Sequence, residues 1–187
     1  MDRLKALRIG ALAWNKMNSR TVTEVNSLSC DEFVRVLGPV FERSPWVAEA
    51  TWPKRPFASR AALHAALCET VACTGARKQL ALIRSHPDLA GKLASAGALT
   101  AASAHEQADA GLDRLTPEET GLFRENNAAY RAKFGFPFVI CARLNRKEAI
   151  LDGFRARLPN SREQEIQTAL QEIFKIAELR LNDLISN

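Results

Sequence analysis

The chain has 187 residues, of which 47% are hydrophobic and 25% charged, and its formal net charge is +5 at pH 7. This length suits one domain that buries a core without metals or disulfides, and no apolar run approaches the roughly 20 residues of a membrane-spanning helix. The composition therefore excludes an integral membrane protein. Lysine and arginine are scattered among acidic residues, so a small anionic substrate explains the positive charge as well as nucleic acid does.

The cysteines and the chain ends bear on cellular location. The spacing of the cysteines fits neither a metal site nor a redox motif. They are Cys30, Cys68, Cys73 and Cys141. We expect reduced thiols in a cytoplasmic protein, since residues 1–24 lack a secretory signal and the C-terminus is not a peroxisomal signal of the Ser-Lys-Leu type. Residues 1–24 are expected to form a loose extension, and residues 25–187 a single helical domain.

The first predicted helix begins near Ser29. Ser29 can cap it, Glu32 can reach back to the cap, and Leu28 can pack on Phe33. The next stretch, residues 45–57, contains three prolines and several aromatic side chains. We expect it to be a loop held down by those aromatics.

Two further helices are predicted before the middle of the chain, one after Ser59 and one from about Ala76. The second of these should stop at Pro87, because proline disfavours helical backbone in the residue before it. His86 is therefore expected at a helix exit, where a loop begins. Functional side chains often occupy such positions.

The second half of the chain shows clear helix starts. Ser103 and Glu106 have the spacing of a capping box, and Thr116 followed by Pro117 marks a helix that should end near Gly135. Residues 136–142 are apolar without helical periodicity and include a proline, which predicts a buried extended segment. Its backbone amides would be available to bind a ligand.

The last elements are also helical. One helix should begin at Asn145 and be closed by Pro159, and a long final one should start at Ser161. With one doubtful strand candidate, the pattern predicts an all-α, single-domain helical bundle of about seven to nine helices.

Arg180 interrupts an apolar stripe on the final helix. A 4-3-4-3-4 spacing relates the positions of the stripe, which are Ile166, Leu170, Ile173, Ala177, Arg180 and Leu184. Arg180 should thus face the core, where an unpaired guanidinium costs several kcal/mol. Either a carboxylate of the protein pairs with it, its stem reaches out to solvent, or a cavity receives an anionic ligand.

Two residues are candidates for acid–base chemistry. The imidazole of His86 changes charge near neutral pH, and Asp88 could orient it, although a solvated loop histidine is the common alternative. Glu106 is a second candidate. Its competing role is the ordinary capping box with Ser103.

Other functional classes have less support. No short pair of metal ligands joins the histidines, so a metal-dependent hydrolase is a weaker alternative. No glycine-rich phosphate loop, GxSxG elbow or dinucleotide fingerprint is present. A non-catalytic helical module that binds an anionic partner, with Arg180 as a buried ion-pair anchor, also stays open.

Four blocks, in order, resemble one enzyme family. The chain is similar to 2-oxo-4-hydroxy-4-carboxy-5-ureidoimidazoline (OHCU) decarboxylases, from about Leu28 to Leu184. The blocks are Arg84–Gly91, Ser103–Leu112, Asn127–Ile140 and Ile176–Leu181. The resemblance implies a cofactor-free, metal-free, all-α homodimer of urate degradation that yields (S)-allantoin. It implies a small-molecule ureide substrate, with neither nucleic acid nor membrane as a partner.

The resemblance also assigns site residues. It implies that His86 and Glu106 are the catalytic pair. The substrate-binding residues that it implies are Pro87, Ser103, Gln107, Phe138, Val139, Ile140, Cys141, Ala142 and Arg180. Residues 138–142 would bind the substrate ring through their backbone. An anionic ligand would account for the inward-facing Arg180, and the missing peroxisomal signal suits a bacterial-type cytoplasmic enzyme.

Overall fold

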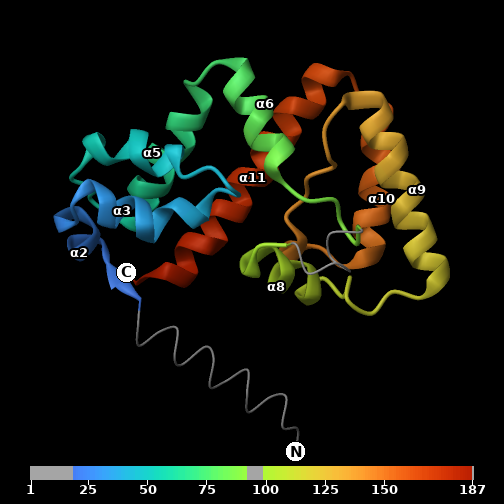
Figure 1. Cartoon of the computed structure of the whole chain (residues 1–187), viewed down its shortest axis with the longest axis horizontal. Coiled ribbons are helices and arrows are strands. Elements are labelled where there is room, and N and C mark those ends of the chain that lie inside the picture. The colour runs from blue at the N-terminus through green and yellow to red at the C-terminus, as the bar shows by residue number, and fades with distance from the viewer. Residues whose placement is uncertain (1–18, 92–98, 187) are drawn as a thin grey trace, which may run out of the picture. The chain divides into compact units, whose positions relative to one another are not determined.

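The computed structural model describes residues 19–91 and 99–186. Within these residues it contains nine α-helices (Figure 1), which confirms the all-α prediction. The helices are α2 (Val22–Ser27), α3 (Cys30–Leu37), α4 (Trp46–Thr51), α5 (Arg60–Ala72), α6 (Ala76–Ser85), α8 (Ala101–Asp109), α9 (Pro117–Phe134), α10 (Lys147–Arg157) and α11 (Arg162–Leu184). Three short 3-10 helices are η1 (Gly38–Val40), η2 (Trp52–Lys54) and η3 (Ala142–Leu144). None of the described helices is long and apolar enough to cross a bilayer.

The backbone forms two compact units. Unit 1 contains the described residues up to Cys73 together with those from Ala177 onward, and unit 2 is Thr74–Ile176. The C-terminal part of α11 therefore belongs to unit 1, although most of this helix belongs to unit 2.

Unit 1 packs around the buried faces of α3 and α5. The capping box predicted for α3 is present, because the Ser29 hydroxyl accepts from the Glu32 backbone and the Glu32 carboxylate accepts from the Ser29 N–H. The core side chains of these helices include Phe33, Leu37, Leu63, Leu67 and Val71. Strand β1 (Arg20–Thr21) pairs in parallel with β2 (Ile185–Ser186), so the last described residues complete this unit.

The loop predicted for residues 45–57 is wrong over most of its length. Helix α4 and the 3-10 helix η2 occupy residues 46–54. Pro45 is the residue just before α4, and Pro53 lies in the first turn of η2. Proline is tolerated at both places, because the backbone N–H that it lacks has no partner at the start of a helix.

The described structure begins within residues 1–24, which were expected to form a loose extension. Residues 19–24 of the predicted extension are described and include β1 and the start of α2. A capping box between Thr21 and Glu24 begins this helix, and hydrogen bonds from Thr21 lower the pKa of the Glu24 carboxyl. Residues 1–18 lie outside the described residues.

Unit 2 is built on an aromatic core. Tyr130 of α9 is fully buried at its centre, and Phe134, Phe136, Phe138 and Phe154 surround it with ring centroids 4.5 to 6.2 Å away. Such offset and edge-to-face contacts add to the burial of apolar surface.

The predicted boundaries of the unit 2 helices are largely confirmed. Thr116 and Glu119 form the capping box of α9, and the helix ends at Gly135, whose φ of 78° is left-handed. Ser161 and Gln164 exchange capping hydrogen bonds at the start of α11. Helix α10 begins at Lys147 with Arg146 before it, slightly later than expected.

The predicted extended segment, residues 136–142, lies outside any helix or strand as far as Cys141, whose backbone is extended, and Ala142 begins η3. All of residues 136–141 except Ile140 are buried. The predicted stripe of α11 is buried at Leu170, Ile173, Ala177 and Arg180, whereas its two end positions are half-buried.

Candidate active site

His86 lies at the exit of α6, as predicted. It is the C-cap residue, with extended backbone (φ −74°, ψ 139°), because the following Pro87 disfavours continuation of the helix. Its side chain is buried, with 7% of its surface exposed. The Nδ1 atom lies 3.0 Å from the Leu82 carbonyl oxygen. A carbonyl only accepts, so Nδ1 carries a hydrogen, and in a neutral ring Nε2 is then the acceptor.

Asp88 does not play the orienting role that we expected. Its carboxylate accepts two hydrogen bonds from Arg131 Nε, at 2.8 and 3.0 Å. The Leu82 carbonyl holds the imidazole of His86 instead. Asp88 therefore anchors the loop to α9.

The loop after His86 is held chiefly by Gln107. The side-chain Oε1 of Gln107 accepts from the Ala90 N–H at 3.0 Å, and its Nε2 donates to the Asp88 carbonyl at 3.4 Å. Asn127 Nδ2 adds a bond to the Leu89 carbonyl at 2.8 Å. Ala90 has a left-handed φ of 51°, a conformation that needs such support.

Helix α8 presents Ser103, Glu106 and Gln107 on one buried face. Their exposed fractions are 5%, 8% and 6%, and the spacing of three and four residues puts them side by side. The helix begins at Ala101, and its N-cap is Thr100, whose hydroxyl accepts from the Ser103 N–H. The capping box between Ser103 and Glu106 is therefore wrong, and burial of the Glu106 carboxylate has to have another cause.

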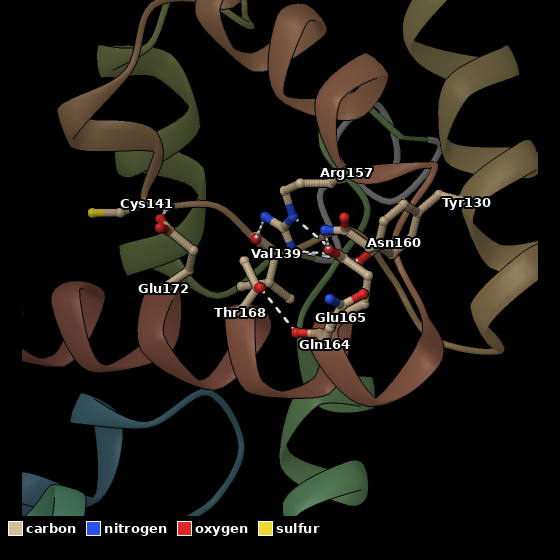
Figure 2. Close-up of polar contacts among 9 residues, drawn as sticks. All are labelled: Tyr130, Val139, Cys141, Arg157, Asn160, Gln164, Glu165, Thr168 and Glu172. Carbon is tan, nitrogen blue, oxygen red and sulfur yellow. Dashed lines mark hydrogen bonds and ion pairs between the residues drawn. The ribbon is translucent and has the colours of Figure 1, made fainter.

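Two charged side chains hold the extended segment (Figure 2). Arg157 Nη1 donates to the Val139 carbonyl at 2.7 Å, and Glu172 Oε2 accepts from the Cys141 N–H at 2.8 Å. The Cys141 amide is therefore engaged by the protein itself. Burial, and secondarily the charge of Glu172, raise the pKa of the Cys141 thiol to about 11, so this thiol is protonated at neutral pH.

Sequence reasoning missed the buried carboxylate of Glu165. It is fully buried and pairs with Arg157 at 2.9 Å, while the Tyr130 hydroxyl donates to it and Asn160 Nδ2 donates at 2.6 Å. Burial and the bond to Glu165 raise the pKa of the Tyr130 hydroxyl. One signal was present, since Glu165 lies four residues before the buried Ala169 and hence on the same face of α11.

Arg180 is buried, as its position on the stripe predicts. Only 6% of its surface is exposed, and its Nη2 lies 3.2 Å from the Glu42 carboxylate, itself 3% exposed. Its Nη1 donates to the carbonyls of Pro39 and Val40 at 3.2 and 3.4 Å. A carboxylate of the protein thus pairs with it. Arg180 belongs to unit 1, whereas His86 and Glu106 belong to unit 2, so a pocket shared by all three stays a prediction.

The histidines do not gather around a metal site. Among the described residues, no group of three or more His, Cys, Asp or Glu side chains is arranged to hold a metal ion. His105 is exposed and lies 3.6 Å from Asp109, and His64 Nε2 lies 3.3 Å from the Cys68 sulfur.

Comparisons with known proteins all point to one family. The family model described as OHCU decarboxylase matches residues 26–182. A protein of Amia calva named 2-oxo-4-hydroxy-4-carboxy-5-ureidoimidazoline decarboxylase is 48% identical over 87% of this chain and 93% of its own. One of the same name from Halalkalicoccus jeotgali is 42% identical over 90% and 93%.

Two solved structures share the fold. A crystal structure of (S)-allantoin synthase matches with a TM-score of 0.71 and 30% identity, over 88% of this chain and 54% of that one, so this chain spans about half the length of that synthase. A crystal structure of OHCU decarboxylase in the presence of (S)-allantoin matches with a TM-score of 0.60 and 22% identity, over 73% and 87% of the two chains. This chain belongs to the OHCU decarboxylase family.

Proposed function

We propose that this protein, a carboxy-lyase of urate degradation, decarboxylates OHCU to (S)-allantoin with His86 and Glu106 as its catalytic pair. The observation that carries the assignment of the pair is their burial, at 7% and 8% exposure, within unit 2. Ionisable groups are seldom buried without a structural or chemical reason. The capping role that would have explained Glu106 is absent, since Thr100 caps α8.

The chemistry suits a protein that supplies only orientation and proton transfer. OHCU contains a C=N bond next to the carboxylated carbon, so the electron pair released as CO2 departs can flow into that bond. Neutral His86, with its hydrogen on Nδ1, would accept a hydrogen bond or a proton from the 4-hydroxyl at Nε2. Glu106 would hold the ureido N–H groups, so that the new proton arrives on one face.

The remaining substrate contacts belong to the same proposal. Ser103 lies beside Glu106 on α8, and Pro87 fixes the chain after His86. Gln107 serves the site by holding the loop at Asp88 and Ala90. We further propose that the protein is a cytoplasmic homodimer whose substrate is a small ureide.

A circular-dichroism assay with freshly generated OHCU tests the activity. We expect the protein to accelerate loss of OHCU and to produce optically active (S)-allantoin, because a buried acid–base pair delivers the proton to one face. The spontaneous reaction in the same buffer is the control, and it should give no net optical activity. Decay at the spontaneous rate to racemic product would contradict the proposal.

Substitution of Arg180 tests whether its buried guanidinium contacts the substrate. If it grips the ring oxygen as negative charge develops, Arg180→Lys should lower kcat by about 10- to 100-fold, because lysine lacks the bidentate fork. A clamp on the departing carboxylate would mainly raise KM. Steady-state kinetics and melting temperatures, with Glu42→Gln as the matched variant, separate these roles. A purely structural ion pair would change only the melting temperature in both variants.

A further inference from the structure

Arg157 and Glu172 contact the extended segment at alternate residues. Arg157 bonds the Val139 carbonyl at 2.7 Å, and Glu172 bonds the Cys141 N–H at 2.8 Å. In Figure 2, Arg157 reaches Val139, and Glu172 extends from α11 toward Cys141. Ile140 lies between these two anchored residues.

The two anchored groups determine where the peptide groups of Ile140 point. In a planar trans peptide, the C=O of one residue and the N–H of the next point in opposite directions. The Val139 C=O points to Arg157, so the Ile140 N–H points away from Arg157. The Cys141 N–H points to Glu172, so the Ile140 C=O points away from Glu172. Ile140 is also the one residue of 136–142 that is not buried.

Both anchors are themselves held in place. Arg157 lies with its guanidinium carbon 4.3 Å from the Phe138 ring centroid, and the buried Glu165 accepts from its Nε and its Nη2 at 2.9 Å. Glu172 is largely buried and pairs with Lys175 at 2.5 Å. Charge-assisted bonds of this kind are stronger and more directional than neutral ones.

We propose that Arg157 and Glu172 are positioning residues, which hold residues 139–141 so that the peptide groups of Ile140 face a cyclic ureide. A ureide ring carries adjacent N–H and C=O groups, and these complement the C=O and N–H of one extended residue. The inference rests on the proposed function. It adds that Arg157 and Glu172 fix the position of the substrate-binding backbone without touching the substrate themselves.

Three variants test this role for Glu172. Glu172→Ala removes the acceptor for Cys141 N–H and should raise KM about 10-fold, with a smaller effect on kcat, because ring contacts made in both ground and transition states are weakened. Glu172→Gln keeps a carbonyl oxygen as acceptor and should restore near-normal KM. Lys175→Ala, which removes the exposed partner of Glu172 but keeps the acceptor for the Cys141 N–H, is the matched control and should raise KM much less than Glu172→Ala.

Binding of (S)-allantoin provides a readout that is independent of turnover. We expect calorimetry to show its Kd rising in Glu172→Ala in parallel with KM. If Glu172→Ala yields no folded protein, Arg157→Lys replaces it and should raise the Kd in the same way. The single ammonium of lysine cannot replace the guanidinium, which binds Glu165 and the Val139 carbonyl at once.

The outcomes separate this inference from the proposed function. Unmodified protein that accelerates OHCU decay, beside folded Glu172→Ala with unchanged KM and Kd, would overturn the positioning role alone. Equal losses in Glu172→Gln and Glu172→Ala would also overturn it, because the acceptor would not be what matters. Unmodified protein without activity or allantoin binding would overturn both.

Discussion

Replacement of His86 by alanine is expected to lower the rate of OHCU decarboxylation about 100-fold or more, because general acid–base catalysis by one positioned side chain contributes that much. Glu106→Gln should lose a similar factor if its charge takes part in proton placement. Initial rates from circular dichroism, corrected for spontaneous decay, give both values.

Neighbouring residues provide the controls for this experiment. His105→Ala removes an exposed histidine of α8, whose side chain is 75% exposed, and Asp109→Asn removes its carboxylate partner. Both should leave turnover near normal. His86→Ala should also lower the free energy of unfolding, because it loses the hydrogen bond to Leu82, usually about 1 kcal/mol, and the packing of a buried ring, so its melting temperature has to be measured beside its turnover. Near-normal turnover in His86→Ala or Glu106→Gln would refute the role of that residue.

Glu165→Ala is expected to lower the free energy of unfolding by about 3–5 kcal/mol, the usual result of removing one partner of a buried ion pair. The substitution leaves the Arg157 guanidinium, whose side chain is 11% exposed, without its carboxylate. It also removes the acceptor of Tyr130 and Asn160. Urea denaturation monitored by far-ultraviolet circular dichroism measures the change.

Glu163→Ala is the matched control for Glu165→Ala. Glu163 lies in the first turn of the same helix and is exposed, so its loss should change stability by no more than about 0.5 kcal/mol. A similarly small effect of Glu165→Ala would show that the buried network does not stabilise unit 2.

Local signals predicted most of the helix starts. The capping residues Ser29, Ser59, Thr116 and Ser161 act within three residues of sequence, so their pattern is readable without the fold. The same local rule failed at Ser103. Thr100, three residues earlier, is an equally good cap, and spacing alone does not choose between the two.

Sequence patterns did not predict which residues pair with the buried charges. Periodicity correctly placed Arg180 on a buried face, but its partner Glu42 lies 138 residues away along the chain. Glu165 was missed for the same reason, since the hydrogen bond from Tyr130 spans 35 residues. Periodicity identifies which side of a helix is buried, whereas tertiary structure decides what each buried charge meets.

Unit 1 is built from two separate parts of the sequence, and this affects when it can form during synthesis. Its first part ends at Cys73, but β2 and the end of α11 complete it, and Arg180 supplies the charge that balances Glu42. Unit 2 is continuous in sequence, whereas the two parts of unit 1 are separated by the whole of unit 2. Unit 1 cannot be completed before residues 177–186 have been translated, so until then Glu42 is without Arg180.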